Sequence, residues 1–199
     1  MEYLVTGITD INSKKVRIQI NYDEYIALYK GEARRFHIEE GCLIEEKAYG
    51  QIMNEILPKR ARERCFNLLA QKNMTELELR KKLTDSYYPS QIIDSIISCL
   101  KRNHLIDDEF YADNFVSFHQ KNKSVRQIKQ ELSKKGIDRE TVSRIIEDNP
   151  IDEEQNIVRI LEKKHFDAEN ATPEERAKIC GYLLRKGYDY DKVRRMIME

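Results

Sequence analysis

Apolar residues recur at helical spacing along most of the chain, and one stretch shows the pattern most clearly. Val125, Ile128 and Leu132 lie three and four positions apart, so they share one face of a helix. Ser124 precedes them as a helix cap, and Gly136 suits the left-handed residue that ends a helix. A second apolar stripe follows directly. The stretch predicts two short helices around a glycine turn, which must pack on neighbours because neither can bury its stripe alone.

The same pattern returns twice elsewhere in the chain. Gly187 follows Gly136 after 51 residues, Thr75 precedes Ser124 by 49 residues, and the apolar positions agree with these offsets. Thr75 and Thr172 each stand three residues before a glutamate, which is the spacing of a capping box. A leading helix is expected before each helix pair, over residues 60–72, 107–121 and 152–165. We therefore expect a tandem array of three three-helix repeats.

The beginning of the chain has a different period. Apolar residues alternate with polar ones over residues 16–22, which is typical of a half-buried strand. Segments 3–9 and 25–29 are expected to flank it in a small antiparallel sheet of about three strands, which needs a helix to dock on. Residues 43–57 predict that helix, and Pro58 is expected to break or kink the chain.

The predicted fold class is therefore mainly α, a tandem array of three three-helix repeats with a small antiparallel β leader. The linkers are only a few residues long, which favours a compact array over separated modules. The predicted boundaries are 1–57 for the leader with its connecting helix, 58–105 for repeat 1, 106–150 for repeat 2 and 151–199 for repeat 3.

Composition restricts the function without defining it. The 199 residues include 35 basic and 35 acidic side chains, so the chain as a whole is not a polycation. Its four cysteines are isolated from one another, which indicates the reduced thiols of a cytosolic protein. No apolar run approaches the roughly 18 residues of a membrane span, and no basic-then-apolar secretion signal is visible. We expect a cytoplasmic protein.

The sequence contains no recognisable catalytic motif. Glycine-rich phosphate loops, dinucleotide fingerprints, zinc-protease motifs and nucleophile elbows are all missing from it. The four histidines are scattered, which favours surface or half-buried positions over a metal site. Asp107, Asp108 and Glu109 could suggest metal binding, but a negatively charged helix start is the better interpretation. We expect no catalytic residue, no metal and no cofactor.

The remaining functional signal is basic. Lys134 and Lys135 end the middle helix of the second repeat, and Arg185 and Lys186 stand at the matching place in the third. The helix dipole stabilises such cations by about 0.3–1 kcal/mol each, so a solvated helix face also explains them. The alternative is a partner-binding surface along the array, formed by Arg126, Lys129, Lys134, Lys135, Lys178, Arg185, Lys186, Arg194 and Arg195.

Two segments give a specific resemblance. Residues 100–112 are LKRNHLIDDEFYA and residues 131–137 are ELSKKGI, and with them the chain resembles the RecX family of regulators of the bacterial recombinase RecA. The resemblance covers nearly the whole chain and implies three three-helix repeats. Two departures stand out. The first repeat has Tyr87 where the second has Gly136, so its inter-helix turn should differ, and the third repeat has three extra residues before Gly187, about one added turn.

The resemblance implies a non-enzymatic negative modulator in homologous recombination and DNA repair. Members of this family bind in the groove of the RecA–DNA filament and block its growth or promote its disassembly. The ATPase, strand exchange and SOS coprotease activities of RecA fall as a result. We therefore expect a monomer whose partner is RecA in its filament on DNA, with weak direct DNA contact left open. Two alternatives remain: a direct nucleic-acid-binding helical-repeat protein, and a helical scaffold for an unrelated partner.

Overall fold

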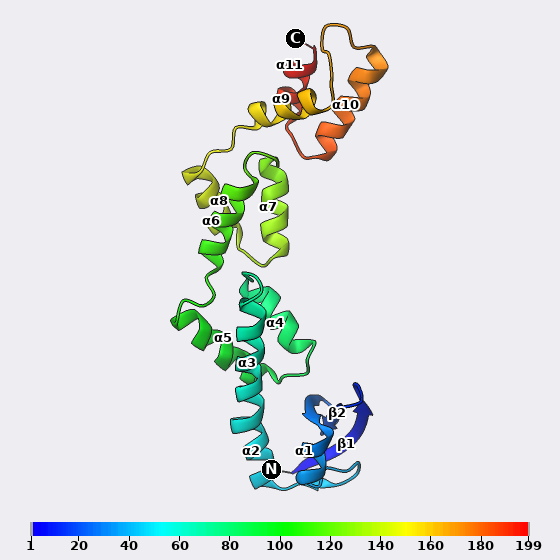
Figure 1. Cartoon of the computed structure of the whole chain (residues 1–199), viewed down its shortest axis with the longest axis vertical. Coiled ribbons are helices and arrows are strands. Elements are labelled where there is room, and N and C mark those ends of the chain that lie inside the picture. The colour runs from blue at the N-terminus through cyan, green and yellow to red at the C-terminus, as the bar shows by residue number, and fades with distance from the viewer. Residues whose placement is uncertain (1, 199) are drawn as a thin grey trace. The chain divides into compact units, whose positions relative to one another are not determined.

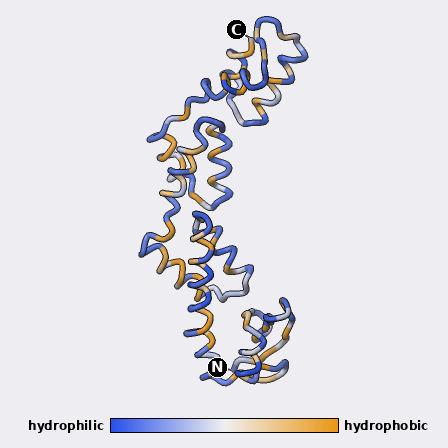
Figure 2. Tube along the Cα trace, viewed as in Figure 1, coloured by the Kyte–Doolittle hydropathy of each residue, from blue (hydrophilic) through white to orange (hydrophobic). Residues whose placement is uncertain are grey.

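In a computed structural model the chain is mainly helical with one small sheet, which confirms the predicted fold class (Figure 1). The structure describes residues 2–198, and they fall into two compact units. The first unit ends at Asp107 and the second begins at Asp108. Figure 2 shows hydrophobic positions recurring at short intervals along the helices of both units, as expected for amphipathic helices. Within the described range, no helix is both long enough and apolar enough to cross a membrane.

The leader forms an antiparallel sheet of four strands in the order β3-β2-β1-β4. The predicted alternation is confirmed in the central strand, where Val16, Ile18 and Ile20 are buried. The expectation of about three strands and of a helix beginning at residue 43 is wrong, because Leu43 and Ile44 pair with the start of β1. A strand of two residues is too short to show alternation, so the pattern could not reveal it. The strands are β1 (Tyr3–Asp10), β2 (Lys15–Ile20), β3 (Glu24–Tyr29) and β4 (Leu43–Ile44).

The helix after the leader is more continuous than predicted. Pro58 does not break the chain, because a π-helical turn lies directly before it and the Leu57 N–H bonds to the Ile52 carbonyl oxygen, five residues back. This wider turn accommodates the proline ring, which in a regular helix would clash with the carbonyl four residues earlier. A short helix after β3 was also not predicted. The elements are α1 (Lys30–Arg35), α2 (Glu46–Gln51), η1 (Ile52–Ile56) and α3 (Leu57–Leu69).

Three helices form each repeat, close to the expected ranges. The first repeat has α3, α4 (Glu76–Thr84) and α5 (Ser90–Arg102). The second has α6 (Asp108–His119), α7 (Val125–Lys134) and α8 (Arg139–Asp148). The third has α9 (Glu153–Lys163), α10 (Pro173–Arg185) and α11 (Tyr190–Met198). The leader and the first repeat share one hydrophobic core, whereas the second and third repeats each bury their own apolar cluster.

The inter-helix turns repeat more faithfully than the sequence indicates. Gly136 and Gly187 have φ values of 87° and 83°, which confirms the predicted left-handed turns. Tyr87 in the first repeat also has a positive φ, 59°, so the expectation of a different turn there is wrong. The next residue's N–H bonds back to the carbonyl oxygen of a buried leucine in all three turns, at 3.1–3.2 Å. In the third repeat α10 has 13 residues against 10 in α7, which confirms the added turn.

Candidate partner-binding groove

The second and third repeats meet through Ser124, the residue that caps α7. Its hydroxyl oxygen accepts from the Gln127 N–H at 3.2 Å and donates to the Lys186 carbonyl oxygen at 2.7 Å. Gly187 follows, and a Cβ atom there would lie 2.9 Å from the Ser124 Oγ and 3.2 Å from the Arg126 Cβ. Only glycine lets the backbone of the third repeat approach α7 this closely. One serine thus both starts a helix and fixes its neighbour repeat.

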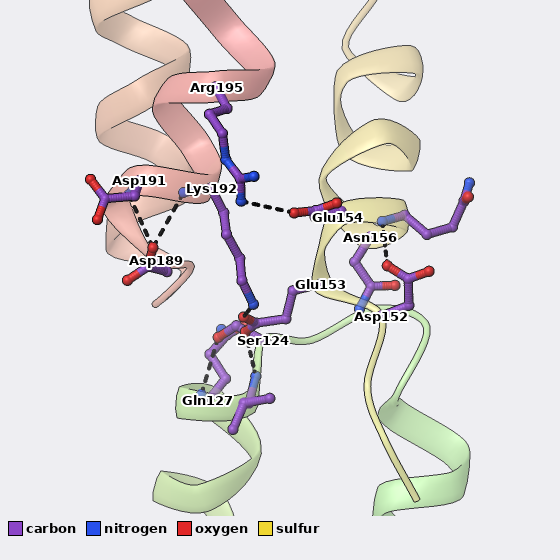
Figure 3. Close-up of polar contacts among 12 residues, drawn as sticks. Ser124, Gln127, Asp152, Glu153, Glu154, Asn156, Asp189, Asp191, Lys192 and Arg195 are labelled. Atoms are coloured by element: carbon purple, nitrogen blue, oxygen red, sulfur yellow. Dashed lines mark hydrogen bonds and ion pairs between the residues drawn. The ribbon is translucent and has the colours of Figure 1, made fainter.

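A buried carboxylate makes the second connection between these repeats. Glu153, in the first turn of α9, accepts from the Val125 N–H and from the Lys192 Nζ, both at 2.9 Å (Figure 3). Its side chain is only 8% exposed, and the hydrogen bond to it raises the pKa of Lys192. Because Val125 opens α7, the carboxylate also satisfies a backbone donor that the helix itself leaves unpaired. The same glutamate therefore joins α7, α9 and α11.

Backbone carbonyl groups before α7 provide the third connection. The Asn156 side-chain amide donates to the Gln120 and Lys123 carbonyl oxygens at 2.7 and 3.3 Å, and Asn156 is 2% exposed. Buried polar groups of this kind must be paired to be tolerated, so they restrict how one repeat can sit on the next. The local pattern predicts Ser124 as a helix cap. The contacts of Ser124, Glu153 and Asn156 to another repeat could not be predicted from that pattern.

These contacts hold two walls around a groove of about 1070 Å³. One wall comes from α7 and the start of α8, and it presents Arg126, Lys129, Lys134 and Arg139, all exposed. The other wall comes from the turn between α10 and α11, with Leu184, Gly187, Tyr188, Asp189 and Tyr190. Val125, Ile137, Val142 and Glu153 also line the groove.

The groove has an excess of available positive charge. Within the described part of the chain, none of the four cations on its first wall has an acidic partner within ion-pair distance. The two acids of the groove are engaged otherwise: Glu153 with Val125 and Lys192, and Asp189 as the acceptor for the N–H groups of Asp191 and Lys192 at 3.0 and 3.2 Å (Figure 3). An anionic ligand would meet cations that no internal carboxylate neutralises.

Two tyrosines give the second wall its chemistry. The Tyr190 ring, at the start of α11, is 55% exposed. Tyr188 is 4% exposed, and its hydroxyl is buried with no hydrogen-bond partner among the residues that the structure describes. Burial, together with the nearby charge of Glu153, raises the pKa of Tyr188 to about 12, so the group is a neutral donor. A buried donor without a partner is costly, by about 1–3 kcal/mol.

The structure distributes the predicted cations over several environments. Arg126, Lys129 and Lys134 line the groove together, and so does Arg139, which was not among the predicted site residues. Lys178 and Arg185 line a different hollow, formed by the third repeat alone. Lys134 and Arg185, which hold equivalent positions in the second and third repeats, therefore line different hollows. The others are Lys135 over the Tyr111 ring, Lys186 over the Tyr182 ring, Arg194 exposed, and Arg195 paired with Glu154 at 3.1 Å.

No group of three histidine, cysteine or acidic residues that could hold a metal ion occurs among residues 2–198. The acids at the start of α6 each have an interaction within the protein. The four cysteines are all free.

Three-helix repeats in tandem, the second and third of them joined by polar contacts around a cationic groove, define a helical-repeat protein as the class. Family models identify the particular family. The first, second and third three-helix domains of RecX match residues 61–100, 107–144 and 152–197. The chain belongs to the RecX family.

Individual relatives agree with this assignment. The regulatory protein RecX of Caldanaerobacter subterraneus subsp. tengcongensis is 30% identical over 163 residues, covering 80% of both chains. That of Clostridioides difficile is 28% identical over 190 residues, covering 94% of this chain and 89% of the relative. Among solved structures, RecX from Lactobacillus salivarius is similar with a TM-score of 0.61 and 26% identity, over 71% of this chain and 95% of that one. Another crystal structure of a regulatory protein RecX covers 98% of both chains with a TM-score of 0.62, and at 20% identity it supports the fold alone.

Proposed function

We propose that this protein regulates the recombinase RecA, and that it does so by binding the RecA–DNA filament and lowering its activity. Membership of the RecX family is the observation that carries the proposal. The regulation is expected to reduce ATP hydrolysis, strand exchange and coprotease activity, as the family resemblance implies. The protein acts by binding and has no catalytic role of its own.

Two features of the second unit support a binding mechanism. A row of short repeats presents a long surface, and a helical filament offers a long groove of complementary shape. The cationic wall of α7 carries charges that are not neutralised within the described part of the chain, so it suits the acidic side chains or phosphates of a nucleoprotein filament.

The central test measures ATP hydrolysis by RecA on single-stranded DNA, with this protein added from substoichiometric to equimolar amounts. RecA turnover should fall, and this protein without RecA should hydrolyse no nucleotide. Unchanged turnover at an equimolar ratio over a range of salt concentrations would overturn the proposal. Capture of a different protein from bacterial lysate, with RecA left behind, would point instead to an unrelated partner.

The surface is tested by charge reversal at the two matching cation pairs. Lys134→Glu with Lys135→Glu should weaken filament binding and its salt dependence, because Lys134 lines the groove. The matched change, Arg185→Glu with Lys186→Glu, alters a region outside the groove lining. Circular dichroism checks that both variants fold. Wild-type binding by both would remove these residues from the site and leave them as helix-end cations.

A further inference from the structure

We propose that the turn between β2 and β3 is a docking point for a protein partner, with the Tyr22 ring inserted into an apolar hollow that basic side chains border. This surface belongs to the leader, whereas the cationic groove belongs to the second and third repeats. The chemistry of the turn defines the kind of partner. That the partner is RecA rests on the proposed function.

Tyr22 has a backbone conformation that its side chain disfavours. Asn21 and Tyr22 have φ values of 50° and 72°, so two successive residues are left-handed. Asparagine tolerates this conformation and glycine adopts it readily, but the Cβ of a tyrosine comes too close to the following carbonyl oxygen. Strain of this kind persists only where surrounding contacts impose it, and it concentrates at functional sites. The chain therefore keeps a tyrosine at a position where glycine would fit the turn better.

Hydrogen bonds to β1 hold this turn in place. The Asn21 N–H donates to the Leu4 carbonyl oxygen, and the Asn21 side-chain oxygen accepts from the Leu4 N–H, both at 2.9 Å. The Tyr22 N–H donates to the Thr6 Oγ1 at 3.2 Å. The backbone is thus fixed before a partner binds, so little conformational entropy is lost when the tyrosine side chain is buried.

The ring of Tyr22 differs from those of the other leader tyrosines. Tyr3 stacks on Tyr49 with 3.6 Å between ring centroids, and Tyr25 and Tyr29 each carry a cation over their rings. Tyr22 is 74% exposed and has no ring or cation contact among the described residues. Tyrosine is one of the residues that dominate binding energy at protein interfaces, because its rigid ring fills a pocket at little entropic cost. A strained, rigidly held and exposed tyrosine fits this role of an anchor.

Acidic residues beside the ring define the charge of the partner. Asp23 follows Tyr22, and Glu2 lies by the turn because the Asn21 side-chain amide donates to its carbonyl oxygen at 3.1 Å. Both acids are exposed, and neither has a cation within ion-pair distance in the described part of the chain. Such charges repel the phosphates of nucleic acids and lipids and attract a basic protein surface. RecA suits this requirement, because a protein that forms a filament on DNA presents cations to the phosphates.

The test measures binding of the full-length protein to RecA filaments assembled on immobilised single-stranded DNA. Tyr22→Gly should weaken this binding about tenfold or more, because it removes the anchor ring. Its melting temperature should stay the same or rise, because glycine relieves the left-handed strain. Tyr22→Phe keeps the ring and should bind within about threefold of the wild type, since a net hydrogen bond is worth at most about that much at an exposed hydroxyl.

Two further variants test the charge of the partner and the specificity of the site. Asp23→Lys should weaken binding to RecA filaments, because a lysine repels a basic surface, whereas a tip that faced phosphates would bind more tightly after this change. Ile11→Ser is the matched control. Ile11 is 41% exposed and follows β1 in the turn at the opposite end of β2, so its loss should not alter affinity.

Wild-type binding by Tyr22→Gly, or equal losses in Tyr22→Gly and Ile11→Ser, would overturn the docking point and leave the proposed function standing. A lower melting temperature of Tyr22→Gly would make the tyrosine a part of the fold and overturn its role as an anchor. Tighter binding by Asp23→Lys would assign the turn to nucleic acid instead. A wild-type protein that does not bind RecA filaments would overturn both proposals.

Discussion

Gly187→Ala should lower the free energy that holds the third repeat on the second by about 2–3 kcal/mol, because two constraints act on this glycine. Its φ of 83° is in the left-handed region. Its α-carbon also faces Ser124, whose hydroxyl oxygen lies 2.9 Å from where a Cβ would be. Each constraint alone would make alanine less stable than glycine at this position, and together they should make it less stable still.

The magnitude follows from these two constraints. A left-handed conformation costs a residue with a Cβ about 1–2 kcal/mol relative to glycine. Moving the Ser124 hydroxyl away from the new methyl group weakens its bonds to the Gln127 N–H and the Lys186 carbonyl oxygen, at about 1 kcal/mol each. Alanine also restricts the unfolded chain more than glycine does, which raises the free energy of unfolding by about 0.4–1 kcal/mol and offsets part of this loss. The net loss is about 2–3 kcal/mol.

Two other glycines separate the contributions. Gly41 has a φ of 82°, and a methyl group on its α-carbon would find no other atom within 4 Å, so Gly41→Ala should show the backbone cost alone, about 1 kcal/mol. Gly181 lies inside α10, where a Cβ would meet only the flexible end of Arg185 at 3.5 Å. Gly181→Ala should therefore stabilise the protein by up to about 1 kcal/mol through helix propensity.

Hydrogen exchange measured by mass spectrometry is the appropriate assay, because the second and third repeats have separate cores and need not unfold together. Gly187→Ala should speed exchange at the Val125 and Gln127 N–H groups, whose acceptors lie at the junction. Urea unfolding followed by circular dichroism gives the stability of all three variants. Equal stability of Gly187→Ala and Gly181→Ala, with unchanged exchange at the start of α7, would refute the reasoning.

Three further variants test other parts of the fold. Gly136→Val should lower stability by roughly 1 kcal/mol or more, because a β-branched residue is strained at φ 87°, and an unchanged melting temperature would contradict this. The hydrogen bond from Lys101 holds the pKa of Glu76 below its ordinary value, so this carboxylate stabilises the fold above that ordinary pKa and loses its effect as pH falls through the lowered one. Glu76→Gln should therefore flatten the decline of melting temperature in acid, and parallel curves for variant and wild type would speak against it. Tyr87→Ala should cost about 0.5–1 kcal/mol by removing the ring beneath the Arg17 guanidinium, and a double-mutant cycle with Arg17→Met that gives no coupling would assign this contact no role.

Much of the fold could be predicted because its determinants are local. Helix stripes, threonine and serine caps and glycine turns depend on residues three or four positions apart, and their recurrence along the chain reveals the repeats. The complete capping boxes at Thr75 and Thr172 and the left-handed Gly136 and Gly187 follow from such short-range rules.

Other elements depended on contacts that no local pattern carries. β4 forms because Leu43 and Ile44 pair with the first strand, some 40 residues earlier in the chain. Tyr87 keeps the left-handed turn without being glycine, and its ring lies by Arg17 of the leader sheet, 5.4 Å from the guanidinium. Residue propensity alone predicts only strain at such a residue, because the compensating contact is remote in sequence.

The candidate site likewise has features that the sequence predicts and features that depend on tertiary contacts. The sequence by itself determined that cations recur at helix ends and along α7, because residue type and helical spacing are sufficient for that. Only the tertiary structure decided which of them are neutralised: Arg195 meets Glu154 across 41 positions, while Arg126 and Lys129 face a groove with no acidic partner among the described residues. The groove itself exists because the Ser124 hydroxyl reaches the Lys186 carbonyl oxygen, 62 positions away. Pairing of charges and hydrogen bonds acts over a few ångströms in space, and the distance along the chain carries no information about it.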